Sequence, residues 1–201
     1  LARSSDAVVM VMGGQSGLTW NCTTGEFRDA TDLGLPGVQE KLINTVLATG
    51  KPVVLVLVNG RPAAIPGIAE KVNAILEAWI PGEEGGRAVA AALFGSVNPG
   101  GKLPLSIPRS VGQIPVFYNH KPSGMHSNIY GDYYDQQAVP LFCFGHGLSY
   151  TSFEYSELKI NPLDVNPGET VEISLDIRNN GTLAGDEVVQ LYLRDEYASF
   201  P

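Results

Sequence analysis

Cysteine is scarce in this chain of 201 residues, which contains only Cys22 and Cys143. Two cysteines are too few for the disulfide framework of a small secreted domain. Two separate thiols are the favoured interpretation, and a disulfide between them is the alternative. The first residues show neither an initiator Met nor a signal-peptide pattern. Cytoplasmic, periplasmic and secreted locations therefore all stay open.

Positive charge is also in short supply. The 13 Lys and Arg stand against 21 Asp and Glu, which gives a net charge of −8 and a pI near 4.8. A nucleic-acid partner is not expected, because no basic cluster offers a surface for phosphates. No stretch approaches the roughly eighteen apolar residues that a membrane-spanning helix needs. A membrane partner is not expected either.

The motifs of nucleotide and metal sites are missing as well. Neither Gly-x-x-x-x-Gly-Lys-Ser/Thr nor Gly-x-Gly-x-x-Gly after a strand occurs, so we expect no cofactor. The three histidines, His120, His126 and His146, are not at metal-ligand spacing, and no Cys/His cluster accompanies them. We therefore expect no metal.

A serine nucleophile elbow is nearly present but incomplete. Residues 14–17 read Gly-Gln-Ser-Gly, yet Leu18 stands where Gly-x-Ser-x-Gly requires glycine. An acyl hydrolase with Ser16 as its nucleophile is thus a distant alternative. Labelling of Ser16 by a fluorophosphonate would support it.

What the first half does contain is an alternation of strands and helices. Apolar runs at 7–12, 52–58 and 74–79 predict strands, and the unbroken run at 52–58 is typical of a central strand buried on both faces. Helices are predicted near 36–50, 65–72 and 87–94, the first with Pro36 in its opening turn and Gly50 as its left-handed stop. This alternation predicts an α/β fold with a mostly parallel sheet flanked by helices.

A long connection of about twenty residues lies between the first strand and the first helix. Loops of that length inside compact domains are more often functional than structural. Functional residues of open α/β sheets also collect at the carboxyl ends of strands. Glu26, in the middle of this connection, is the first candidate for a site residue. The alternative is a solvated carboxylate that stabilises the approach to the helix.

The second half changes character twice. Residues 96–149 are rich in proline, glycine and aromatics and predict long loops. From about residue 151 the period becomes two, and the alternation over 171–178 predicts a half-buried strand. A turn at 179–181 and a further strand at 188–193 follow. This pattern resembles the opening of an antiparallel β-sandwich.

Several blocks of the sequence resemble glycoside hydrolase family 3, in the order and at the spacing of that family and across nearly the whole chain. They are residues 25–39 (with Gly25-Glu26 and Leu35-Pro36-Gly37), 56–62 (ending Asn59-Gly60-Arg61-Pro62), 78–86 (ending Pro81-Gly82-Glu83-Glu84-Gly85-Gly86), 93–104 and 144–150 (Phe144-Gly145-His146-Gly147-Leu148-Ser149-Tyr150).

The resemblance implies a division into domains. The family combines a TIM-like barrel, an α/β sandwich and often a fibronectin-III-like domain. Residues 1–150 match the α/β sandwich without its first βα unit, and residues 151–201 match the beginning of a fibronectin-III-like domain. The barrel domain would be an N-terminal partner within the same protein.

The resemblance also implies a division of catalytic labour. The family's nucleophile is an Asp of the barrel, in a Ser-Asp-Trp segment that does not occur here. Its general acid/base is a Glu that matches Glu26. A retaining glycosidase needs both carboxyl groups, so these 201 residues alone are expected to be inactive.

Four further residues are candidates for contact with substrate: Trp20, Arg28, Asp29 and His120. Trp20 lies in the connection of Glu26 and suits either stacking on a sugar or packing. Ala30 replaces an Arg of the family that follows Asp29. An ion pair made by that Arg is therefore absent or is supplied by Arg28.

The resulting expectation is part of a retaining, exo-acting β-glycosidase that acts on β-linked oligosaccharides or β-glucosides. A β-glucosidase is the first choice and a β-xylosidase the near alternative. The rival from another class is a non-catalytic carbohydrate-binding or scaffold fragment. A Ser-Asp-Trp segment elsewhere in the gene would favour the glycosidase. A homodimer stays open.

Overall fold

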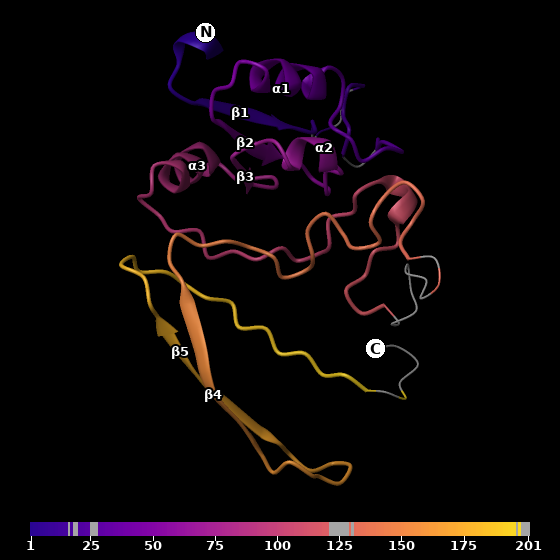
Figure 1. Cartoon of the computed structure of the whole chain (residues 1–201), viewed down its shortest axis with the longest axis vertical. Helices are drawn as coiled ribbons and strands as arrows, with labels where there is room; N and C mark the ends of the chain where they lie inside the picture. Colours follow the sequence, from indigo (N-terminus) through magenta and orange to yellow (C-terminus); the bar gives the residue numbers. More distant parts are fainter. Residues whose placement is uncertain are drawn as a thin grey trace. The chain divides into compact units, whose positions relative to one another are not determined.

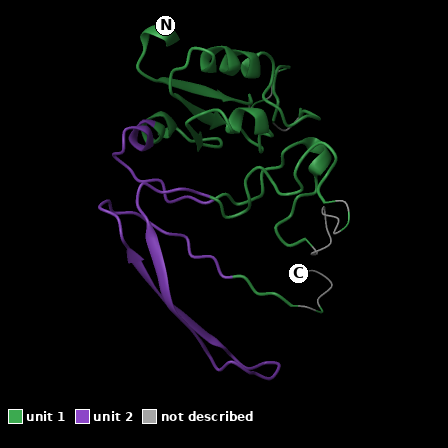
Figure 2. Ribbon diagram, in the orientation of Figure 1, with its two compact units in different colours: residues 1–89, 103–146, 192–201 green, residues 90–102, 147–191 purple. Residues whose placement is uncertain are grey.

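A computed structural model describes residues 1–15, 17, 20–24, 28–120, 129, 131–195 and 197. Figure 1 shows their helices and strands along the chain. The chain forms two compact units, coloured separately in Figure 2. The first contains residues 1–89, 103–146 and 192–201, and the second contains residues 90–102 and 147–191.

The first unit is built on a three-stranded parallel sheet. Its strands are β1 (Val8–Gly13), β2 (Val53–Val58) and β3 (Ala74–Glu77), in the order β1-β2-β3. The predicted parallel α/β arrangement is confirmed, with the run at 52–58 as the central strand. Val53, Leu55 and Val56 are fully buried, because a central strand has neighbours on both edges and on both faces.

The described residues contain three α-helices: α1 (Gln39–Leu47), α2 (Pro66–Ala69) and α3 (Gly85–Leu93). Two short 3-10 helices lie at Ala2–Ser4 and Val111–Gln113. The prediction that Pro36 opens the first helix is wrong. Gly37 has a φ of +65°, a left-handed conformation that a right-handed helix does not include, and α1 begins only after it. Gly50, at a φ of +75°, follows the helix as predicted.

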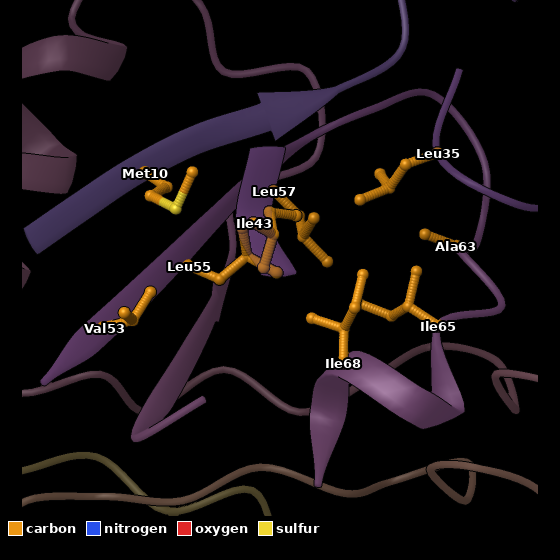
Figure 3. Close-up of a cluster of buried hydrophobic side chains, with 9 residues drawn as sticks. All are labelled: Met10, Leu35, Ile43, Val53, Leu55, Leu57, Ala63, Ile65 and Ile68. Carbon is orange, nitrogen blue, oxygen red and sulfur yellow. The ribbon is translucent and has the colours of Figure 1, made fainter. Parts of the chain in front are cut away.

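One apolar cluster fills the space between the sheet and its helices (Figure 3). Side chains of alternate β2 residues share one face of the strand, and they meet Ile43 of α1 and Ile68 of α2. The cluster comprises Met10, Leu35, Ile43, Val53, Leu55, Leu57, Ala63, Ile65 and Ile68. Not every apolar residue of α1 takes part, since Leu42 is 48% exposed. Leu42 therefore lies away from the core.

The segment after α3 contains few regular elements, as predicted. Within residues 103–146, Ile107 and Phe142 form an isolated antiparallel bridge. Gln113 is buried, and its side-chain nitrogen donates to the backbone oxygen of Ala138 at 2.6 Å. The buried Gln113 side chain thus hydrogen-bonds to the backbone of another loop, where no regular strand pairing is present within the described residues.

The second unit contains an antiparallel hairpin of β4 (Phe153–Asn161) and β5 (Glu172–Asn179). The predicted strand near 171–178 is confirmed, but its half-burial is wrong: Ile173 and Ile177 are 40% and 42% exposed. The strand predicted at 188–193 is also wrong, since these residues form no ladder. A strand needs a neighbour for its backbone hydrogen bonds, and no strand within the described residues pairs with this segment.

Cys22 and Cys143 are not joined by a disulfide, so the alternative of a Cys22–Cys143 bridge is wrong. Among the described residues, none of the helices has the length and the apolar character that crossing a membrane requires.

Candidate functional site

The carboxyl ends of the three parallel strands form one edge of the sheet, and the residues that follow these ends build the candidate site. β1 ends at Gly13, β2 at Val58 and β3 at Glu77. Glu26, the predicted acid/base, lies in the connection after β1. It falls outside the described residues, as does Ser16. The geometry of the site is therefore built from the described residues around it.

Close packing fixes the exit of β1. Gly13 has a φ of +141°, and a Cβ there would lie 1.9 Å from the Val58 oxygen. The Gln39 side chain closes the free edge, because its amide accepts from the Gly13 N–H and donates to the Gly13 oxygen, both at 2.8 Å. These two bonds replace those of a missing neighbouring strand, so the connection leaves the sheet from a fixed point.

The connection returns to the sheet edge as two described segments on either side of residues 25–27. Thr24 and Asp29 face each other in an antiparallel bridge. The Thr23 N–H donates to the Gln15 oxygen at 2.9 Å, and the Gln15 N–H donates to the Thr23 hydroxyl at 2.8 Å. Backbone bonds thus tie the segments before and after residues 25–27 to one another and to the exit of β1.

Trp20 and Arg28 lie together. A terminal nitrogen of Arg28 donates to the Trp20 oxygen at 2.6 Å, and the guanidinium carbon lies 5.0 Å from the centre of the indole ring. Trp20 is 82% exposed, and its role, stacking on a sugar or packing, stays a prediction. A cation over one part of an exposed indole restricts its orientation and leaves apolar surface available.

Asp29 has a partner that the sequence reasoning missed. It forms an ion pair with Arg61, and not with Arg28. Arg61 also donates to the Ala30 oxygen at 2.8 Å. The Arg61 side chain is 20% exposed and that of Asp29 is 72% exposed. The available signal was the block Asn59-Gly60-Arg61-Pro62, in which a cation directly follows the carboxyl end of the central strand.

Glu77, at the end of β3, is a second missed residue. Burial raises the pKa of its carboxyl from 4.5 to about 7, while hydrogen bonds from the Trp79 backbone and the Asn59 side chain act in the opposite direction. The Trp79 N–H donates to the carboxyl at 3.1 Å. A single acidic residue inside the apolar run 74–79 was the signal, since an unpaired carboxyl is rarely placed where it loses water.

Trp79 lies just beyond the end of β3 and is not part of the buried core cluster. β3 ends two residues earlier, and the Trp79 ring is only partly buried. Its φ is +51°, which a non-glycine residue adopts at a cost of about 1–3 kcal/mol. Its N–H is held by Glu77 and its oxygen accepts from the Asn59 N–H at 3.0 Å. These two bonds hold the strained residue in place.

Two buried polar atoms at this edge, the Asn59 Oδ1 and the Thr24 Oγ1, have no hydrogen-bond partner within the described part of the chain. The Asn59 amide nitrogen, by contrast, is used, because it donates to the Arg61 oxygen. Asn59, the first residue after β2, is thus polar and buried, and Arg61, two residues further on, is connected to the segment after residue 27.

His120 is exposed. It directly follows Asn119, which lines a pocket of about 360 Å³. The pocket walls are apolar and include Pro62, Ile114, Phe117, Tyr118 and Phe144. The role of His120 in binding substrate stays a prediction. Among the described residues, no group of three or more His, Cys, Asp or Glu is arranged to hold a metal ion.

Comparison with known proteins identifies the family. Residues 1–150 match the model of the glycosyl hydrolase family 3 C-terminal domain. A β-xylosidase of Formosa agariphila is 48% identical over 198 residues, which are 98% of this chain and 27% of that protein. A periplasmic β-glucosidase of Salmonella typhimurium is 42% identical over 204 residues, 98% of this chain and 26% of that protein.

The fold agrees with a solved relative. The structure of a β-glucosidase from Erythrobacter marinus superposes with a TM-score of 0.85 at 42% identity, over 98% of this chain and 26% of that one. The chain thus spans about a quarter of the length of each of these three proteins. With matched residues over most of its length and a shared fold, the chain belongs to glycosyl hydrolase family 3.

Proposed function

We propose that this chain is part of a retaining, exo-acting β-glycosidase that removes terminal non-reducing β-linked sugars. Glu26 is its general acid/base. The observation that carries the proposal is that the two segments flanking residues 25–27 in sequence are tied to the carboxyl edge of the parallel sheet. The names of the relatives, β-glucosidase and β-xylosidase, support the reaction class.

The chemistry explains why one carboxylate is not enough. A retaining glycosidase places two carboxyl groups roughly 5–5.5 Å apart, one to attack the anomeric carbon and one to protonate the leaving oxygen. We place the nucleophile, an Asp, on an N-terminal barrel domain of the same protein. The short span of this chain relative to its relatives supports that division. These 201 residues alone should then leave aryl β-glycosides intact.

We propose that Trp20, Arg28, Asp29 and His120 contribute to the substrate side of the site. An indole exposed to solvent and restricted by Arg28 offers a face on which a sugar can stack. Asp29, held by Arg61, keeps most of its surface in solvent. His120 is the weakest member, supported only by its exposure next to the apolar pocket.

We also propose the domain division at residue 150, with an α/β sandwich over 1–150 and the beginning of a fibronectin-III-like domain over 151–201. The antiparallel β4–β5 hairpin supports the second part. Two of its alternating apolar residues, Ile173 and Ile177, are 40% and 42% exposed. In a β-sandwich such a face is covered by a second sheet.

The sugar is glucose in the first form of the proposal and xylose in the second. The 48% identity to a β-xylosidase specifically favours the second form. The two are separated by kcat/KM of the full-length protein on matched aryl β-glucoside and β-xyloside. A ratio above about tenfold, about 1.4 kcal/mol in transition-state binding, assigns the sugar. Hydrolysis of neither substrate would contradict both forms and leave the scaffold alternative.

The role of Glu26 is tested by the leaving-group dependence of Glu26→Ala in the full-length protein. Protonation matters most for poor leaving groups, because a dinitrophenolate departs without an acid. We expect kcat/KM to fall by about 10²–10⁴ on an alkyl β-glycoside and far less on a dinitrophenyl β-glycoside. Equal losses on both substrates would remove Glu26 from the acid role.

A further inference from the structure

The turn after the central strand, residues 59–62, contacts both flanks of residues 25–27. On one side, Arg61 pairs with Asp29 and donates to the Ala30 oxygen at 2.8 Å. On the other side, Gly60 lies against Thr24: a Cβ at position 60 would stand 2.7 Å from the Thr24 Cγ2. No other residue type fits between them without displacing Thr24. This turn therefore fixes the separation of the two flanking segments.

Glu77, the last residue of the neighbouring strand β3, holds the turn 59–62. The Asn59 side chain donates to the Arg61 oxygen and interacts with the Glu77 carboxyl, whose pKa it acts to lower. Its backbone N–H binds the Trp79 oxygen at 3.0 Å, and the Trp79 N–H binds the same carboxyl. Asn59 is 5% exposed, so its bonds are shielded from competing water.

The energetics of this arrangement favour positioning over stability. The Arg61–Asp29 pair joins a largely exposed carboxylate, and such pairs contribute about 0–1 kcal/mol. Glu77 loses hydration and faces a strained Trp79 backbone. A buried hydrogen-bonded network that contributes little stability but has a single arrangement is well suited to holding a nearby segment in one pose.

We propose that Glu77 is a positioning residue for the acid/base step. Through the Trp79 backbone and Asn59 it fixes the turn 59–62. That turn, through Arg61 and Gly60, holds the segments on either side of residues 25–27. The inference rests on the proposed function of Glu26. Glu77 touches no reacting atom. A misplacement of about 1 Å of a group at the chemistry costs up to about 10²-fold in rate, which sets the expected scale.

The experiment measures kcat/KM of the full-length enzyme on an alkyl and on a dinitrophenyl β-glycoside, for wild type, Glu77→Ala and Glu77→Gln. Glu77→Ala should lose about 10–100-fold on the alkyl substrate and less than about threefold on the activated one. Glu77→Gln keeps an oxygen for the Trp79 N–H and should recover most of the loss. Glu70→Ala, an exposed glutamate after α2, is the matched control and should change neither value.

A second variant guards against a Glu77→Ala protein that does not fold. Arg61→Met removes both contacts to the segment after residue 27 and leaves Glu77 in place. It should show the same loss confined to the alkyl substrate. A double-mutant cycle of Glu77→Ala with Arg61→Met should be clearly non-additive, because both changes release the same segment.

Equal losses on the two substrates, full activity of Glu77→Ala, or additive effects in the cycle would overturn the inference. Failure of the proposed function is distinguishable from these results. In that case the wild-type protein hydrolyses neither glycoside, or Glu26→Ala itself shows no dependence on the leaving group.

Discussion

Stability as a function of pH gives a direct test of the environment of Glu77. Its carboxyl has a pKa of about 7 in the folded protein and 4.5 ordinarily, so the folded state binds the proton more tightly than the unfolded state. The free energy of unfolding should therefore be highest below pH 4.5 with respect to this group. It should fall as the pH rises to about 7 and remain level above that.

The shift in the pKa of Glu77 sets an upper limit on this change in the free energy of unfolding. One pKa unit corresponds to 1.36 kcal/mol, so the full shift would amount to about 3 kcal/mol. Glu77 retains some contact with solvent, which screens charge, and we expect about 1–2 kcal/mol. Glu77→Gln stays neutral at every pH and lacks this contribution. Relative to wild type, the variant should therefore gain about 1–2 kcal/mol of stability between pH 5 and pH 8.

Urea unfolding of full-length wild type and Glu77→Gln at pH 5, 6, 7 and 8 measures this difference. Exposed Glu70 supplies the control, since Glu70→Gln makes the same change in net charge at a site in solvent. Parallel curves for wild type and Glu77→Gln would refute the reasoning. So would a relative gain in the opposite direction, toward acid pH.

Three further predictions concern the framework, and urea unfolding of each variant checks them. Gly13→Ala places a methyl group against the Val58 oxygen and should cost on the order of 3 kcal/mol of stability. Gly131→Ala is the control and should cost less, because a Cβ at position 131 would contact nothing within 4 Å. Gln39→Ala removes both side-chain bonds to Gly13 and should cost about 1–3 kcal/mol. Asn98→Ala removes its bonds to the Ser149 hydroxyl, the Tyr150 N–H and the Ala184 oxygen and should cost a similar amount. Changes below about 0.5 kcal/mol would contradict each of these accounts.

The sheet could be predicted because its signal is local. A fully buried central strand must be apolar along its whole length, and the run at 52–58 has that property. The start of α1 could not be placed by the same reasoning. Pro36 is compatible with a first helical turn, but the left-handed backbone of Gly37 postpones the helix. The conformation of a glycine is set by its surroundings more than by its neighbours in sequence.

The contacts of the candidate site likewise divide into local ones, which the sequence could predict, and contacts between different connections, which it could not. The contact between Trp20 and Arg28 joins residues of one connection and was within reach of sequence reasoning. The pairing of Asp29 with Arg61 joins two connections that meet only because β1 and β2 are adjacent. The same holds for Asn59 and Glu77 across β2 and β3. Such pairs follow from strand order, which periodicity does not give.

The β4–β5 hairpin shows a third kind of limit. Alternation in sequence identifies which residues share a face, but not whether anything covers that face. Ile173 and Ile177 alternate as a buried face would, and both are about 40% exposed.

The most direct test of the account uses azide with Glu26→Ala in the full-length protein and a dinitrophenyl β-glycoside. The activated substrate still forms the glycosyl-enzyme, but its hydrolysis lacks the base that activates water. Azide needs no base, so it should restore turnover and yield a β-glycosyl azide of retained configuration. A variant that azide does not accelerate, or that forms only the free sugar at the wild-type rate, would contradict the assignment of Glu26 as acid/base.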